Sequence, residues 1–199
     1  MYKILVFIVY PWFRLFCHFS VIGKENIPKG KFVLIANHTA YRDPVILACS
    51  MPKKVVRFVA KSDLTRFAFY RWLFKAVKII GINRGGNDIT AMKTCISAID
   101  SGDNVGIFPQ GTRIQGEEPD VDQCMAGLGL MLAHTGVDVL PVAIKYPHNL
   151  PGGRKIKVSI GKVITKEEYM APDEDGEEPR RKEIAIRCFR KVCQLHEKL

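Results

Sequence analysis

The sequence predicts a single α/β domain with a largely parallel central sheet flanked by helices, preceded by an apolar N-terminal helical segment. Short apolar runs alternate with amphipathic stretches along most of the chain, which is the pattern of strands followed by helices. An unbroken apolar run near the N-terminus fits neither kind of stretch. The 199 residues are enough for one domain with a real core and hardly enough for two. We therefore divide the chain into an N-terminal segment, residues 1–22, and a domain, residues 23–199.

The N-terminal segment contains the apolar run from Ile4 to Phe13. Its length is about half of what a helix needs to span a bilayer. No small-residue cleavage site follows, which argues against a secretory signal. Tyr10, Trp12 and Arg14 are residue types that suit the lipid headgroup boundary. The pattern therefore predicts a membrane-associating helix that lies in one leaflet, with a core helix packed on the sheet as the alternative.

Six short apolar runs have the length and composition of buried strands. The predicted strands are residues 32–36, 55–60, 77–82, 105–109, 137–146 and 155–164. Because helices are expected between most of these strands, the connections are long enough to make the sheet largely parallel.

Five stretches have helical periodicity or the residues that begin and end helices. Asp43-Pro44 predicts a helix start with Asp43 near the N-cap, while Gly102 and Gly136 are typical stops. The predicted helices are residues 44–51, 66–76, 88–101, 122–135 and 180–198. The last is amphipathic and follows an acidic stretch that reads as a solvated loop.

The positive charge is concentrated in the first part of the chain. Residues 1–78 contain 14 basic and 3 acidic side chains, whereas residues 79–199 contain 16 and 17. A basic surface suits nucleic acid, anionic lipid or an acidic protein. In residues 66–75 the basic side chains are interleaved with aromatic ones, which suits the interface of a bilayer. Binding of nucleic acid would need a platform of aromatic side chains for base stacking, and nothing else in the sequence resembles one. We therefore predict a membrane lipid surface as a partner, and no nucleic acid.

The six cysteines form no CxxC pair and have no histidine partner at zinc spacing. They predict reduced thiols, mostly in the core, and no metal site. Reduced thiols and polybasic segments together favour the cytoplasmic face of the cell membrane, with a peripheral or monotopic attachment.

His38 and Asp43 form the most informative motif. They follow the predicted strand 32–36 and lie in a strand-to-helix loop, the place where open α/β sheets carry their sites. A carboxylate five residues after the histidine can reach one ring nitrogen, fix the tautomer and stabilise the imidazolium. A surface histidine beside a capping aspartate is the alternative interpretation of this pair alone.

Two arginines also follow predicted strands. Arg113 ends the block Phe108–Arg113, which contains a glycine turn and a hydroxyl, and Arg84 ends the block Gly81–Arg84. A guanidinium offers a planar fork suited to phosphate. Together with His38, these residues predict one site for a phosphorylated substrate.

The chain resembles the glycerolipid acyltransferases, in particular the bacterial 1-acylglycerol-3-phosphate acyltransferases. The resemblance rests on four blocks in order, which are His38–Asp43, Gly81–Arg84, Phe108–Arg113 and Val139–Ile144. It implies transfer of a fatty acyl group from acyl-CoA or acyl carrier protein to lysophosphatidic acid, with no cofactor beyond the acyl donor.

The resemblance also implies residue roles. His38 becomes the general base and Asp43 its orienting partner. Arg84 and Arg113 would bind the acceptor phosphate, and Gln110, Gly111 and Thr112 would shape the acceptor site. A thioester is already activated, so deprotonation of an alcohol and stabilisation of an oxyanion suffice, without a serine or cysteine nucleophile.

Two positions depart from the family's pattern. Gln110 stands where the family usually has Glu, and Cys124-Met125-Ala126 stands where it often has a Lys. Both departures bear on the acceptor, so another lysolipid or an amino-lipid is the first alternative. A non-catalytic lipid-binding protein and a hydrolase of thioesters or lysolipids are further alternatives.

Overall fold

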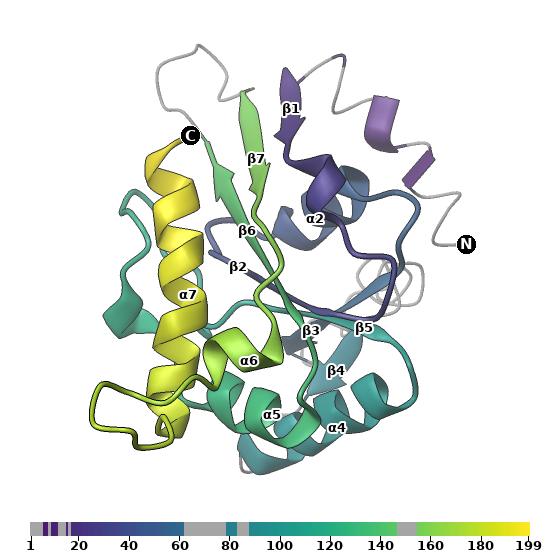
Figure 1. The fold of residues 1–199 in the computed structure, drawn as a ribbon. Helices are drawn as coiled ribbons and strands as arrows, with labels where there is room; N and C mark the ends of the chain where they lie inside the picture. The colour runs from purple at the N-terminus through teal and green to yellow at the C-terminus, as the bar shows by residue number, and fades with distance from the viewer. Residues whose placement is uncertain are drawn as a thin grey trace.

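The computed structural model describes residues 6–7, 9–11, 15, 17–61, 79–82, 88–146 and 155–199 (Figure 1). Seven strands form one sheet in the order β1-β7-β6-β2-β5-β3-β4. The strands are β1 (Phe19–Ile22), β2 (Val33–Ala36), β3 (Val56–Lys61), β4 (Ile80–Ile82), β5 (Asn104–Ile107), β6 (Val139–Lys145) and β7 (Ile156–Ile160). The five strands from β6 to β4 are mutually parallel, whereas β7 runs antiparallel to β6 and β1 runs parallel to β7. The predicted α/β domain with a largely parallel sheet is confirmed.

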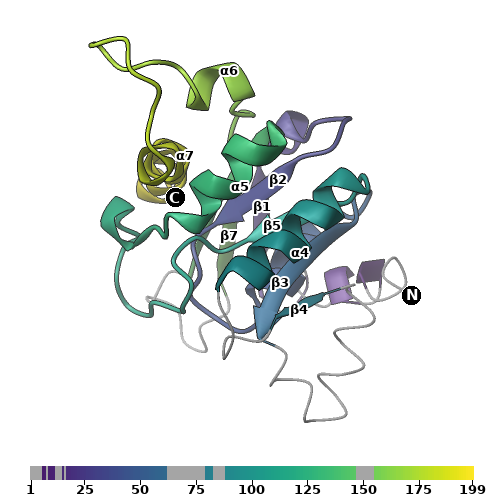
Figure 2. The ribbon, with the colours of Figure 1, turned by 90° about the horizontal axis from the view of Figure 1, so that it is seen from below.

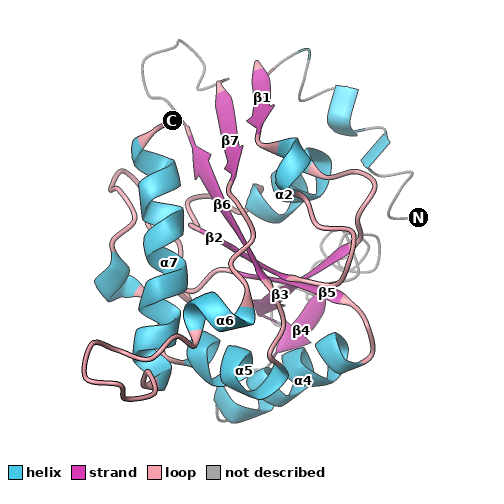
Figure 3. Ribbon diagram, viewed as in Figure 1, coloured by secondary structure: helices cyan, strands magenta, loops and turns pink. Residues whose placement is uncertain are grey.

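Helices cover both faces of the sheet (Figure 3). They are α2 (Asp43–Ser50), α4 (Asp88–Asp100), α5 (Gly127–Thr135), α6 (Lys166–Tyr169) and α7 (Arg181–Glu197), with 3₁₀ turns η1 (Lys24–Asn26) and η3 (Val121–Gln123). Figure 2 shows α4, α5 and α7 together on one side of the strands. Among the described residues, no helix is both long enough and apolar enough to cross a bilayer.

The central strand β2 explains why there are two cores. Its side chains alternate between the faces, and all four are fully buried. Val33 and Ile35 pack in the core formed with α4, α5 and α7. Leu34 and Ala36 pack in the second core, with α2 and Val6 of the N-terminal segment. A strand buried on both faces has a continuous apolar sequence, which is why the run 32–36 could be recognised.

Three differences from the predicted elements stand out. Phe19–Ile22, which fall in the segment 1–22, form the edge strand β1 and pair with β7, so the sheet begins four residues before the predicted domain. The helix predicted at 122–135 begins only at Gly127, because the Asp120 capping box closes the short turn η3 first. The predicted helix 66–76 lies outside the described residues.

Candidate active site

The site forms where three neighbouring strands end. β2 lies between β5 and β6 and is parallel to both, so their carboxyl ends meet at one edge of the sheet. His38 follows β2, Phe108 to Arg113 follow β5, and Tyr146 follows β6. Asn37 fastens this edge, because its side-chain amide donates to the Ile144 carbonyl and accepts from the Ile144 N–H, each at 2.8 Å.

The predicted contact between His38 and Asp43 is present, with 2.8 Å between Nδ1 and Oδ2. The same oxygen accepts the backbone N–H groups of Thr39 at 2.7 Å and Ala40 at 2.8 Å. The other oxygen, Oδ1, accepts the hydroxyl of Tyr146. Four donors thus surround a fully buried carboxylate, as burial of a charge requires.

This arrangement fixes the chemistry of the imidazole. A carboxylate can only accept, so the shared proton is on Nδ1 and the Nε2 lone pair is available to take a proton. The His38 side chain is 18% exposed, and because Nδ1 is bonded to Asp43, Nε2 is the nitrogen left to meet a substrate. Phe108 stacks on the ring at a centroid distance of 4.1 Å and restrains its orientation.

Asp43 lies next to the N-cap of α2, as expected, but its side chain does not cap the helix. It is the first residue of the helix, Arg42 occupies the N-cap position, and no side chain there makes a capping bond. The physical reason is that both carboxylate oxygens are already bonded to groups outside the helix. Pro44 still falls in the first turn of α2, where its missing N–H costs nothing.

Tyr146 is a site residue that the sequence did not single out. Its hydroxyl donates to Asp43, and the Arg42 guanidinium lies 4.7 Å from its ring centroid. Burial, and then the charge of Asp43, raise the pKa of Tyr146, so the hydroxyl keeps its proton and remains a donor. The feature of the sequence that could have identified Tyr146 is its position directly after β6, the third strand that ends at this edge of the sheet.

Gln110 is turned into the protein. Its Oε1 accepts the His38 N–H at 2.8 Å, and its Nε2 donates to Gln123 Oε1 at 2.7 Å. Gln123 Oε1 also accepts the Asp120 N–H at 3.2 Å, within the capping box of η3. An amide at position 110 can serve both neighbours because it offers an acceptor and a donor, which a carboxylate does not.

Arg113 lies against the loop that carries His38 and Asp43. Its guanidinium carbon is 3.3 Å from the ring centroid of Tyr41, a residue of the His38–Asp43 loop. The two loops are also joined by the Ile114 N–H, which donates to the His38 carbonyl at 2.9 Å. Stacking of this kind holds the planar guanidinium in one orientation while its N–H groups remain available for an anion.

The turn between Phe108 and Arg113 depends on Gly111, whose φ of 68° is a left-handed conformation. Met125 packs on this turn, since a Cβ atom added to Gly111 would lie 2.4 Å from the methionine sulfur. Thr112 is exposed beside it. Arg84 lies outside the described residues. β4, which precedes it, is the third strand from β2, about 14 Å away at ~4.8 Å per strand.

Within the described part of the chain, no group of three or more His, Cys, Asp or Glu side chains is arranged to hold a metal ion. The six cysteines are all buried and unpaired, as predicted. Burial raises the pKa of Cys49 to about 12 and that of Cys95 to about 11, so these thiols are poor nucleophiles.

The fold and these strand-end motifs define a known class. The family model described as Acyltransferase matches residues 18–145, and the chain belongs to this family. Among curated relatives, it is similar to 1-acyl-sn-glycerol-3-phosphate acyltransferases. The enzyme of Borreliella burgdorferi is 33% identical over 65% of this chain and 52% of its own length. That of Bacillus subtilis is 28% identical over 50% of this chain and 51% of its own length.

One solved structure shares the fold over nearly the whole chain. It is the 1-acyl-sn-glycerophosphate (LPA) acyltransferase PlsC from Thermotoga maritima, with a TM-score of 0.64 and 24% identity, covering 97% of this chain and 77% of that one. The chain spans about half the length of the two curated relatives named above.

Proposed function

We propose that this protein transfers a fatty acyl group from acyl-CoA or acyl carrier protein to the sn-2 hydroxyl of 1-acylglycerol-3-phosphate, which yields phosphatidic acid. The carrying observation is the buried Asp43 bonded to His38 Nδ1, which leaves Nε2 as an accessible base. The names of the relatives support the substrate class, since each is a 1-acyl-sn-glycerol-3-phosphate acyltransferase.

In the proposed reaction, the acceptor hydroxyl gives its proton to His38 Nε2 while its oxygen attacks the thioester carbonyl carbon. The C–S bond then breaks, and the proton on Nε2 passes to the departing thiolate. Asp43 stabilises the imidazolium between these steps, and Tyr146 holds Asp43 in place. Direct attack by the alcohol is supported by the burial of all six cysteines.

The acceptor phosphate is proposed to bind Arg113, whose stacking on Tyr41 holds the guanidinium against the His38–Asp43 loop. Arg84 is proposed as a second phosphate ligand, with Gly111 and Thr112 shaping the pocket for the glycerol. Because both polar ends of Gln110 bond to the protein, we propose that it positions the His38 backbone.

A different lysolipid or an amino-lipid acceptor is the second candidate. The observation in its favour is Met125, a 47% exposed apolar side chain packed on the turn that carries Gln110. It occupies the stretch where the family often has a Lys. A less anionic headgroup would suit this surface better than a phosphate monoester.

We also propose that residues 1–22 attach the protein to the cytoplasmic face of the membrane. Among the residues described there, Phe7 is 78% exposed and Leu15 is 74% exposed, while Val6 packs into the core beneath α2. A segment that is anchored on one side and apolar on the other suits the interface of a bilayer.

The test is acyl transfer in detergent micelles from acyl-CoA and from acyl carrier protein to a panel of lysophosphatidic acid, uncharged lysolipids and amino-lysolipids. We expect product with lysophosphatidic acid and a loss of roughly 10²–10⁴-fold in His38→Ala. His134→Ala, which removes a histidine from α5, is the matched control. Equal activity in His38→Ala, or a trapped acyl-enzyme, would overturn the mechanism. Product only with another acceptor would move the proposal to the second candidate.

A further inference from the structure

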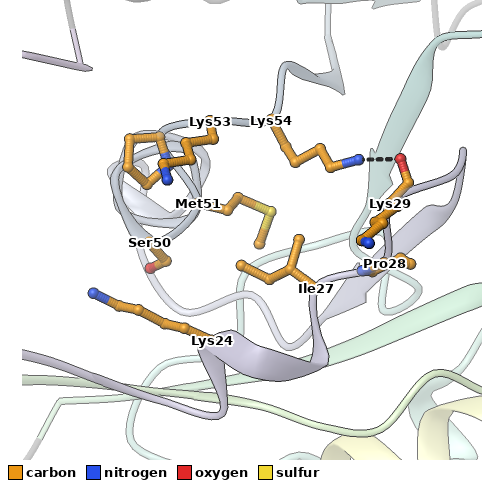
Figure 4. A pocket seen from close by; sticks show the side chains of 9 residues that line it. Lys24, Ile27, Pro28, Lys29, Ser50, Met51, Lys53 and Lys54 are labelled. Atoms are coloured by element: carbon orange, nitrogen blue, oxygen red, sulfur yellow. Dashed lines mark hydrogen bonds between the residues drawn. The ribbon is translucent and has the colours of Figure 1, made fainter.

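A pocket lies at the end of α2 opposite to His38. The pocket, of about 560 Å³, opens between η1 with its following loop and the last residues of α2 with the turn after them (Figure 4). Its lining residues are Lys24, Ile27, Pro28, Lys29, Ser50, Met51, Pro52, Lys53 and Lys54. α2 begins at Asp43 and ends at Ser50, so about 10 Å of helix separates this pocket from the site.

The pocket combines an apolar floor with a cationic rim. Figure 4 shows Met51 and Ile27 pointing toward each other across its centre. Four lysines lie around them, and no acidic side chain is among the described residues that line it. The Lys54 side chain spans one side of the pocket, where its ammonium donates to the Lys29 carbonyl at 2.5 Å.

The rim continues into the N-terminal segment. The ammonium of Lys24 lies 6.0 Å from the ring centroid of Tyr10, which itself packs edge-on against Phe19. The same segment exposes Phe7 and Leu15, and β1 exposes Ile22. Cationic side chains beside exposed apolar ones are the composition of a surface that meets lipid headgroups and the first acyl carbons.

We propose that this pocket binds the phosphate headgroup of one anionic phospholipid of the bilayer, apart from the acceptor at His38. The ammonium groups of Lys24, Lys29 and Lys53 would face the phosphate, and the floor of Ile27 and Met51 would contact the glycerol and upper acyl carbons. The domain is thereby held on an anionic membrane in one orientation. This proposal does not require catalysis, because binding is measured without turnover.

The first experiment is cosedimentation with vesicles of phosphatidylcholine, with and without about 30% phosphatidylglycerol, for wild type and the variant Lys24→Ala/Lys29→Ala/Lys53→Ala. Each lysine near an anionic surface contributes roughly fivefold, so binding to anionic vesicles falls on the order of 100-fold. The three side chains are exposed, and circular dichroism verifies that the variant folds. The matched control Lys162→Ala/Lys166→Ala/Lys198→Ala also removes three exposed lysines and should change binding less than about fivefold. Equal losses in the two variants would overturn the proposal in favour of a general charge effect.

A second experiment locates the contact in the wild-type protein. Lysine acetylation followed by mass spectrometry should show protection of Lys24, Lys29 and Lys53 by anionic vesicles, with Lys162 unprotected. Protection by inorganic phosphate alone would assign the pocket to a soluble anion, and protection only by acyl carrier protein would assign it to a protein partner. Either result would overturn the lipid proposal. Acyl transfer to a micellar lysolipid, measured for the same triple variant, tests the proposed reaction separately. Transfer without the expected loss of vesicle binding would overturn the lipid-binding proposal and leave the proposed reaction standing.

Discussion

Asp43 holds the arrangement of the site, because four groups from two parts of the chain, the loop 38–40 and Tyr146, donate to one carboxylate. Two of them are backbone N–H groups of the loop, so the loop shape and the imidazole position are set together. The fourth, Tyr146, is 103 residues away in the sequence and arrives through the pairing of β6 with β2.

Tyr146→Phe tests this arrangement. The variant removes one donor from a charged acceptor, a hydrogen bond worth roughly 1.5 kcal/mol. We expect acyl transfer to slow by up to about tenfold, which is the factor if that whole free energy appears in the activation barrier. With one donor fewer, Asp43 attracts the imidazolium more strongly, so the acidic limb of the pH–rate profile moves to higher pH. The measurement is kcat/KM between about pH 5 and about pH 9.

The control is Tyr169→Phe, which also deletes a buried tyrosine hydroxyl. That hydroxyl donates to the carbonyls of Leu132 and Val137, away from the site. We expect lower stability in this variant and an unmoved pH profile. An unmoved profile in Tyr146→Phe as well would show that Tyr146 only supports the fold.

Among short structural elements, η3 fixes the identity of residue 110. The capping box orients the Gln123 amide so that its oxygen faces position 110, and a donor is needed there. Gln110→Glu places two oxygen acceptors against each other in a buried contact, which costs about 1–3 kcal/mol. The measurement is the free energy of unfolding in urea at neutral pH. Gln110→Glu/Gln123→Lys, which restores a donor opposite the carboxylate, is expected to recover part of the loss.

The α5–α7 contact depends on a glycine. A Cβ atom added to Gly129 would lie 1.7 Å from the Arg181 carbonyl oxygen, which is backbone and cannot swing away. Gly129→Ala therefore forces the two helices apart and costs about 1–3 kcal/mol despite the better helix propensity of alanine. Thermal unfolding measures this cost, with Gly30→Ala as the control because that position opens onto empty space. An unchanged melting temperature in Gly129→Ala would show that α5 and α7 can separate without loss.

For the protein as a whole, pH dependence of stability should come partly from His196. Burial, and then nearby Lys145, lower the pKa of His196 from its ordinary value of 6.5. Its Nδ1 is buried without a hydrogen-bond partner among the described residues, and Glu118 is the acidic group that opposes the shift. The unfolded chain then binds a proton that the folded chain excludes, so stability is complete above about pH 6.5 and declines as the pH falls below it.

Urea unfolding at about pH 7.5 and about pH 5.5 checks this expectation. His196→Gln, which is neutral at both pH values, should lose less stability between them than the wild type does. A variant with the same pH dependence as the wild type would assign the effect to other groups.

The sequence was sufficient to predict those features of the fold and the site that depend on a local pattern of residues. The apolar run of β2 and the five-residue spacing of His38 and Asp43 depend only on neighbours along the chain, and both predictions are confirmed. It was insufficient where the partner is distant. The contact of Tyr146 with Asp43 and that of Gln110 with the His38 N–H require knowing that β6 and β5 flank β2. β1 was missed because an edge strand beside an apolar segment has no pattern of its own.

The inaccessibility of every native thiol makes this protein convenient for spectroscopy. A maleimide dye applied to the folded chain should react with an introduced cysteine far faster than with the six buried ones. Burial raises the pKa of Cys49, Cys95 and Cys188, which disfavours the reactive thiolate. A single cysteine at position 7 or 162 therefore reports the depth of that residue in a bilayer without first replacing the native cysteines.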